Sequence, residues 1–188
     1  GLKDAADISR FGGWRAYAHR LRLPANQIHF QLAPNWDGQP LNGRSVLVLG
    51  EQGLGDVCYF SRFLKPLLAD NPCTALIVEP RLLPLLQPAY PDLQMFCDPE
   101  LIGLLPIPLV RIPLGSLPLL YGMSCDQIAS LDHGLKPRDA DLRCVSNRLR
   151  RDADHPRLLG ISLQAGRAGD EYQRRKRSLP TAVVLHQL

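Results

Sequence analysis

Short apolar runs alternate with amphipathic segments along most of this chain, and this alternation limits its fold more than any other feature. The apolar runs are predicted β-strands over residues 45–50, 74–79, 94–97, 109–112 and 158–163. The segments between them carry apolar residues at helical spacing and predict helices over residues 56–70, 81–86, 117–121, 127–131 and 138–151. Strands that alternate with helices form parallel sheets covered on both faces. We therefore expect an α/β fold with a doubly wound, mainly parallel sheet.

The first 23 residues lie outside this alternation and are predicted to form a helix. Apolar residues recur every three or four positions and share one stripe of that helix: Ile8, Phe11, Trp14, Ala18 and Leu21. Residues 24–44 contain several prolines and glycines, which predicts a linker. We therefore divide the chain into a helix over 1–23, a linker over 24–44 and an α/β domain over 45–188. The apolar stripe is expected either to pack on that domain or to drive self-association.

The composition is that of a globular protein. The 188 residues are 45% hydrophobic and 21% charged, and no apolar run approaches the ~18 residues that a membrane span requires. No basic and apolar leader opens the sequence, and the five cysteines include no CxxC pair, which favours reduced thiols and a cytoplasmic location. The sequence also lacks HExxH, a His/Cys cluster and GxSxG, so neither a metal site nor a serine hydrolase is predicted.

The segment Glu51-Gln52-Gly53-Leu54-Gly55-Asp56 follows the first predicted strand directly. In parallel α/β sheets the loops at the carboxyl ends of the strands bind ligands. Two glycines let the backbone approach a ligand closely, and the next helix points its N-terminus at the same place. The GxGxxG spacing of dinucleotide-binding loops is absent. Asp56 has two interpretations here: it is the N-cap of the helix, or it is a general base for an acceptor hydroxyl.

Basic residues are concentrated in the last part of the chain. Residues 136–188 carry 12 Lys and Arg against 6 Asp and Glu. The segment 174–180 precedes a predicted helix, so arginine and helix amides together predict an anion site there; the alternative is a basic loop without a ligand. Nucleic acid is the weaker interpretation, because aromatic residues make up only 6% of the chain and Tyr172 alone lies among these arginines.

Several segments, taken in order, amount to a family resemblance. The strand, loop and helix around 51–56 resemble the signature of bacterial glycosyltransferases fused behind tetratricopeptide repeats. These enzymes are similar to lipopolysaccharide heptosyltransferases and, more distantly, to protein O-linked N-acetylglucosamine transferases. The matching segments between about residues 11 and 182 are 13–17, Trp36-Asp37-Gly38, 60–63, 78–85, 90–91, Gly115-Ser116-Leu117-Pro118, 160–162 and 177–180. One departure is Leu163-Gln164-Ala165-Gly166, where the family usually has Trp and a glycine-rich turn.

The resemblance implies a fold. It identifies residues 45–188 as the Rossmann-like N-terminal half of a GT-B glycosyltransferase, and residues 1–23 as the last helix of a tetratricopeptide repeat array. On this interpretation the second Rossmann domain and the preceding repeats lie outside this chain. We expect such a fragment to be inactive by itself.

The resemblance also implies a reaction: a sugar passes from a nucleotide-sugar donor to a hydroxyl acceptor on a glycan or a protein. Asp56 would be the catalytic base. The substrate-binding residues would be Gln52, Gly53, Leu54, Gly55, Arg177 and Ser178, the last two at the donor diphosphate. No metal and no cofactor other than the donor substrate is implied, and tetratricopeptide-type protein contacts are expected. The alternative is a non-catalytic module that binds a protein or a glycan.

Overall fold

The computed structural model describes residues 13–22, 33–51, 53–98, 103, 105 and 109–150. The chain divides into two units, Gly1–Lys136 and Pro137–Leu188. The sheet and the candidate site belong to the first unit. The predicted strand over 158–163 lies outside the described residues.

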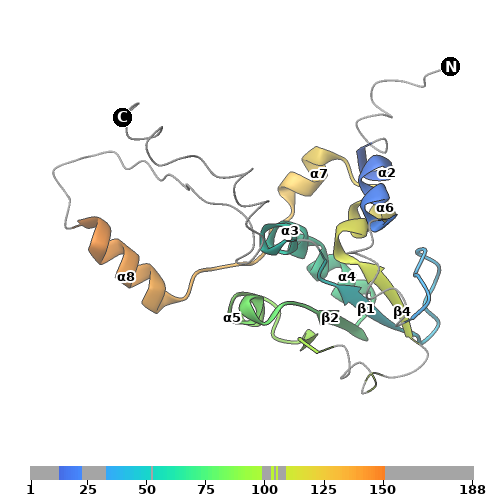
Figure 1. Cartoon of the computed structure of the whole chain (residues 1–188), viewed down its shortest axis with the longest axis horizontal. Helices are drawn as coiled ribbons and strands as arrows, with labels where there is room; N and C mark the ends of the chain where they lie inside the picture. Colours follow the sequence, from blue (N-terminus) through green and yellow to red (C-terminus); the bar gives the residue numbers. More distant parts are fainter. Residues whose placement is uncertain are drawn as a thin grey trace. The chain divides into compact units, whose positions relative to one another are not determined.

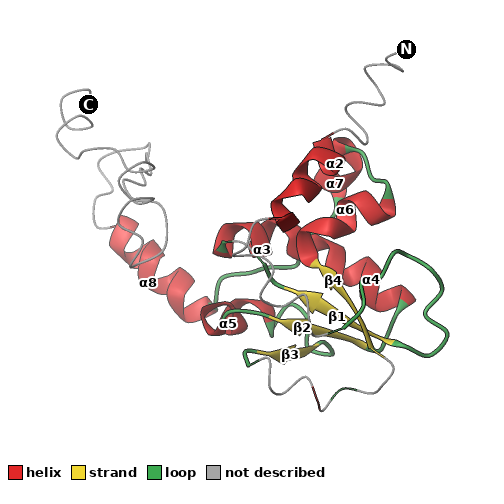
Figure 2. Cartoon of the chain, turned by 45° about the vertical axis from the view of Figure 1, so that its right-hand side comes forward, coloured by secondary structure: helices red, strands yellow, loops and turns green. Residues whose placement is uncertain are grey.

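A parallel sheet of four described strands forms the centre of the first unit (Figure 2). The strands are β1 (Ser45–Leu49), β2 (Thr74–Ile77), β3 (Gln94–Phe96) and β4 (Leu109–Pro113). Each lies within two residues of its predicted bounds, so the α/β class and the parallel sheet are confirmed. The spatial order is β3-β2-β1-β4. The chain therefore moves outward from β1 to β3 and then returns to the other side of β1.

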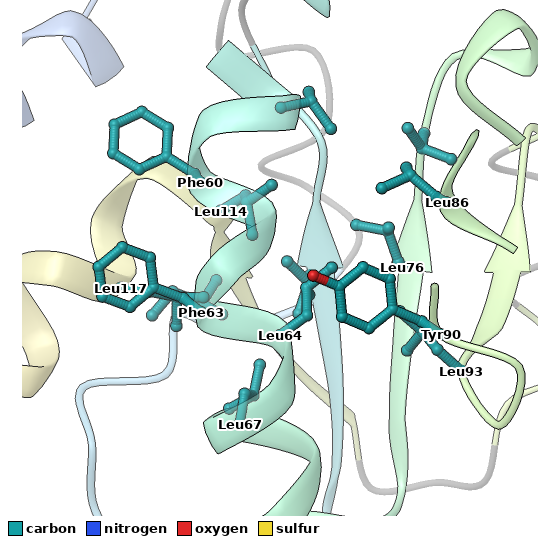
Figure 3. Close-up of a cluster of buried hydrophobic side chains, with 14 of the residues drawn as sticks. Phe60, Phe63, Leu64, Leu67, Leu76, Leu86, Tyr90, Leu93, Leu114 and Leu117 are labelled. Carbon is teal, nitrogen blue, oxygen red and sulfur yellow. The ribbon is translucent and has the colours of Figure 1, made fainter. Parts of the chain in front are cut away.

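One face of the sheet packs against the described helices that follow its strands. These helices are α3 (Leu54–Phe60), α4 (Leu64–Asp70), α5 (Leu83–Leu86), α6 (Leu117–Tyr121) and α7 (Cys125–Ser130). Figure 3 shows the side chains that fill this core, with Phe63 beside Leu117 and Tyr90 beside Leu64. Phe63, Leu64 and Leu117 are fully buried. Such burial stabilises the fold by roughly 1.5–3 kcal/mol for each large side chain.

The opposite face of the sheet is apolar as well. Leu47, Leu49, Ala75 and Ile77 alternate with the residues of the first face and form a second buried cluster with Phe96, Leu105 and Leu109. Apolar residues on both faces are typical of parallel sheets, which have no solvent-facing side.

The predicted helix over 56–70 begins earlier than expected and is broken in the middle. It starts at Leu54 as α3, passes through a 3₁₀ turn over Ser61–Phe63 and continues as α4. Pro66 accounts for the break, because it lacks an amide hydrogen and its ring clashes with the carbonyl group four residues earlier, at Arg62. A 3₁₀ turn before the proline accommodates this change with little loss of hydrogen bonding.

Part of the predicted linker extends the sheet along the outer edge of β4. Asn35 forms a parallel bridge with Arg111. The Arg111 amide donates to the Pro34 carbonyl at 2.9 Å, and the Trp36 amide donates to the Arg111 carbonyl at 2.8 Å. These bonds satisfy backbone groups that an edge strand would otherwise expose. Residues 34–36 are therefore tied to the sheet.

The N-terminal helix packs on the α/β domain, which is one of the two outcomes expected for its apolar stripe. Its described part comprises α2 (Gly13–Ala18) and a 3₁₀ turn over His19–Arg22. Trp14 meets Phe60 edge to face with 6.1 Å between ring centroids, and Tyr17 lies 5.7 Å from the same ring. The helix also contacts α6, beside which it lies in Figure 1. Phe11 lies outside the described residues.

The second unit is described only by α8 (Asp139–Arg150) and the residues just before it. Arg138 donates to Asp141 at 2.7 Å, across the start of the helix. Leu142 and Val145 are about half exposed. No helix among the described residues has both the length and the apolar character that crossing a membrane would take.

Gly50 follows β1 at a point where its backbone lies very close to the end of β2. A Cβ atom at Gly50 would lie 2.8 Å from the Ile77 carbonyl oxygen, whereas one at Gly55 would have no atom within 4 Å. We expect Gly50→Ala to lower the free energy of unfolding by about 1–3 kcal/mol, because the backbone of β2 cannot move aside cheaply. The matched control Gly55→Ala should change it by less than about 1 kcal/mol in either direction. Urea unfolding measures both, and equal losses would contradict the described packing.

Candidate functional site

Two loops meet at the carboxyl edge of the sheet, where the strand order reverses between β1 and β4. One loop follows β1 and leads into α3; the other follows β4 and contains a 3₁₀ turn over Leu114–Ser116. The Gly115 amide donates to Glu51 Oε1 at 3.2 Å and joins the two loops. Ligands of open α/β sheets bind outside the carboxyl ends of the strands, at the point where the strand order reverses.

A buried ion pair between Arg20 and Glu51 occupies this junction. The two side chains are only 7% and 8% exposed. Glu51 Oε1 accepts from Arg20 Nε at 3.0 Å and also from Arg20 Nη2. Arg20 Nη2 donates to Ser116 Oγ at 3.1 Å, and the guanidinium lies 4.1 Å from the centroid of the Tyr17 ring. The pair therefore joins the N-terminal helix to both loops.

Gly115 packs directly against this pair. A Cβ atom there would lie 2.9 Å from both Arg20 Nη2 and Glu51 Oε1. Any larger residue would push against two buried charged groups. The segment Gly115-Ser116-Leu117-Pro118 carries part of the family resemblance. Its first two residues both contact the ion pair, Gly115 by close packing and Ser116 by a hydrogen bond from Arg20.

The buried groups of the junction have shifted acidities. Burial raises the pKa of the Glu51 carboxyl, and the hydrogen bonds from Arg20 and Gly115 oppose that rise. Burial also raises the pKa of the Tyr17 phenol; Arg20 opposes this, and the carboxylates of Asp56 and Glu51 add to it. Among the described residues, neither Tyr17 Oη nor Glu51 Oε2 has a hydrogen-bond partner. The carboxylates of Glu51 and Asp56 therefore share the neighbourhood of Tyr17.

Asp56 lies in the first turn of α3, but it is not the N-cap. The N-cap is Gly53, and Asp56 is the third residue of the helix. The N-cap interpretation is therefore wrong in its position, although Asp56 does stabilise the helix start: its Oδ2 accepts from the Gly53 amide at 3.1 Å. The side chain is exposed. A carboxylate that is anchored through one oxygen and open to solvent can still accept a proton from a ligand.

The other predicted site residues are only partly brought together. Gly53 and Gly55 are exposed beside Asp56, while Leu54 is half-buried and packs against the core. Neither glycine has a positive φ, so no unusual backbone conformation requires glycine at these two positions. Gln52, Arg177 and Ser178 lie outside the described residues, and their predicted contacts stay predictions.

A pocket of about 370 Å³ opens at the end of β4. It is lined by Leu21, Asn35, Trp36, Asp37, Ile112, Pro113, Ser116, Leu119 and Leu120. Two segments of the family resemblance that are distant in sequence, around Trp36 and around Ser116, come together in its wall. We call it the β4 pocket.

Sequence reasoning missed the ion pair and the β4 pocket. Arg20 and Glu51 are 31 residues apart, and no local spacing relates them. The one available signal was a basic residue three positions after Tyr17 on a helix that is otherwise apolar on that side. The described residues also contain no group of three or more His, Cys, Asp or Glu side chains placed to hold a metal ion.

Comparison with known proteins yields one partial relative. Protein FlbA from Caulobacter vibrioides is 33% identical to this chain over 94 residues, which is 47% of this chain and 16% of FlbA. The chain thus spans about a sixth of the length of that protein. No family model matches the chain. No solved structure matches it either.

The ion pair predicts a pH-dependent loss of stability. In Arg20→Met, Glu51 would be buried without its cation, and we expect the free energy of unfolding to fall by about 3–5 kcal/mol at neutral pH. The matched control Arg15→Met removes an exposed arginine from the same helix and should change it by less than about 0.5 kcal/mol.

The loss of unfolding free energy caused by Arg20→Met should become smaller in acid. Without Arg20 the folded-state pKa of Glu51 rises further, so the folded state takes up a proton at higher pH than the unfolded chain does. The deficit is therefore largest above the folded-state pKa and declines as the pH falls toward about 4.3, the value for an unfolded glutamate. Adding Glu51→Gln to Arg20→Met should remove this pH dependence. Urea unfolding across this range checks both points, and a deficit independent of pH would contradict the buried pair.

Proposed function

We propose that this chain is the acceptor-side half of a metal-independent glycosyltransferase of the GT-B architecture, similar to bacterial enzymes that carry tetratricopeptide repeats. The complete enzyme would transfer a sugar from a nucleotide-sugar to a hydroxyl group on a glycan or a protein. The parallel sheet would be its Rossmann-like N-terminal half. The donor-binding half would belong to a longer form of the chain, and this fragment would not turn over substrate.

The observation that carries the proposal is the position of Asp56. It is an exposed carboxylate in the first turn of the helix after β1, beside the reversal of strand order between β1 and β4. Ligands of α/β sheets bind at that edge. Gly53 and Gly55 beside Asp56 are exposed as well. Because Asp56 is exposed, the hydroxyl group of an acceptor would reach its carboxylate from solvent.

Asp56 would act as a general base. It would take the proton of the acceptor hydroxyl while that oxygen bonds to the anomeric carbon of the donor sugar and the nucleoside diphosphate departs. The negative charge of the departing diphosphate needs stabilisation, which Arg177 and Ser178 would supply together with helix amides. In this scheme Asp56, in the first unit, would bind the acceptor. The leaving group would be bound by Arg177 and Ser178, which lie outside the described residues.

The N-terminal helix would join a repeat array to the enzyme. Trp14 and Tyr17 contact Phe60 at the end of α3, the helix that carries Asp56. An array ending in this helix would therefore be fixed directly to the acceptor side. FlbA is much longer than its matched segment, which agrees with a piece of a larger protein.

Asp56→Asn tests the proposal in a longer form that carries the second α/β domain. Asparagine keeps an oxygen that can accept from the Gly53 amide, so the helix start should be preserved. We expect turnover to fall by about 10²–10⁴-fold with little change in melting temperature. Asp92→Asn, an exposed carboxylate between α5 and β3, is the matched control and should leave turnover unchanged. Full turnover of Asp56→Asn with a lowered melting temperature would show that Asp56 only stabilises the helix.

A non-catalytic module that binds a protein or a glycan is the second candidate. The hydrogen bond from the Gly53 amide to Asp56 favours it, because it gives the carboxylate a purely structural task. Such a module would bind its partner both as this chain and as the longer form with the second α/β domain. Neither form would transfer a sugar. Product analysis with radiolabelled nucleotide-sugars separates the two candidates.

A further inference from the structure

The β4 pocket is a cavity that has no role in the proposed catalytic scheme. Its wall combines four parts of the chain: the turn that ends the N-terminal helix, residues 35–37, the end of β4, and the segment from Ser116 through α6. Its volume of about 370 Å³ lies within the range of small-molecule sites. Asp56 and the other described residues of its loop are not among the lining residues.

Several bonds hold the wall around Trp36 in place before any ligand arrives. The Trp36 amide donates to the Arg111 carbonyl at 2.8 Å, and its indole Nε1 donates to the Gln39 carbonyl at 2.8 Å. Asp37 Oδ1 accepts from the Gln39 amide at 3.1 Å. Gly38 has a φ of +94°, and a Cβ atom there would lie 2.7 Å from Leu120 Cδ1. A preformed wall lowers the entropic cost of binding.

The chemistry of the lining fits a sugar ring. Leu21, Ile112, Pro113 and two leucines of α6 provide apolar surface, and Trp36 adds an aromatic side chain. Asn35, Asp37 and Ser116 provide an amide, a carboxylate and a hydroxyl. Sugars present C–H faces that pack on apolar and aromatic groups, and hydroxyl groups that donate to and accept from such polar side chains.

The negative charge in the lining disfavours binding of an anion. Asp37 is the one charged residue of the wall, and it is negative. Arg20 contacts the wall through Ser116, and its charge is balanced by Glu51. Among the described residues, neither lysine nor arginine lines this pocket, so a phosphate there would face Asp37 without the charge-assisted bonds that hold such groups.

We propose that the β4 pocket binds an uncharged sugar ring. Its assignment to the acceptor glycan rests on the proposed function; the binding itself does not. The acceptor would then be held at two places, with its reacting hydroxyl at Asp56 and a ring in the β4 pocket. The second contact would set which glycan is used.

Trp36 provides a direct probe of this pocket. The chain has only two tryptophans, so Trp14→Phe leaves Trp36 as the sole source of tryptophan emission. We expect the methyl glycoside of glucose or of N-acetylglucosamine to shift that emission saturably, and saturation-transfer NMR to show the same sugar bound. Uridine diphosphate should neither shift the emission nor displace the sugar. A response to uridine diphosphate in place of both sugars, or no sugar binding by either method, overturns the proposal.

Two matched carboxylate variants locate the binding. Asp37→Asn should weaken sugar binding about tenfold, the loss expected for a hydrogen bond to a charged group. Asp70→Asn is the control, because Asp70 lines a neighbouring pocket that Trp36 also borders. Unchanged affinity in Asp37→Asn, or a loss confined to Asp70→Asn, overturns the assignment to the β4 pocket.

The binding and the proposed function fail separately. Sugar binding that depends on Asp37, together with no transfer by the longer form, would refute the glycosyltransferase and leave the sugar site standing. Transfer that depends on Asp56, with an acceptor KM unaffected by Asp37→Asn, would refute the sugar site and leave the glycosyltransferase standing.

Discussion

The ion pair between Arg20 and Glu51 is the contact on which the geometry of this edge of the sheet depends. It is almost completely buried and joins the N-terminal helix, the loop after β1 and the loop after β4. Moving two charges out of water is costly, and their attraction offsets that cost only when further hydrogen bonds complete the arrangement. Gly115 and Ser116 contribute to those bonds here. The N-terminal helix is therefore part of the α/β unit.

The two proposed contacts with an acceptor lie on either side of this junction. Asp56 belongs to the helix that follows the Glu51 loop, and Ser116 belongs to the loop that Gly115 ties to Glu51. A substitution that weakened the ion pair would shift the loops after β1 and β4 relative to each other. Alignment of reacting groups can supply several kcal/mol of a reaction barrier, so such a shift would affect transfer without removing a catalytic group.

The sheet shows which parts of a fold follow from local pattern. Short, mainly apolar runs predicted β1 to β4 within two residues, because a strand buried on both faces is rich in apolar side chains. The order β3-β2-β1-β4 had no comparable local signal, since it depends on which strands pair. The pairing of residues 34–36 with β4 was missed for the same reason: prolines and glycines indicated a linker, yet two backbone hydrogen bonds fix it to Arg111.

The sequence by itself determined the α/β class, the strands β1 to β4 and the place of the loop over residues 51–56, because these depend on neighbours along the chain. Only the tertiary structure decided what surrounds that loop. It moved Asp56 from the N-cap to the first turn of α3, paired Arg20 with Glu51 across 31 residues, and brought Trp36 and Ser116 into one pocket. These contacts join segments that are distant in sequence, and their energies depend on burial, which no local spacing records.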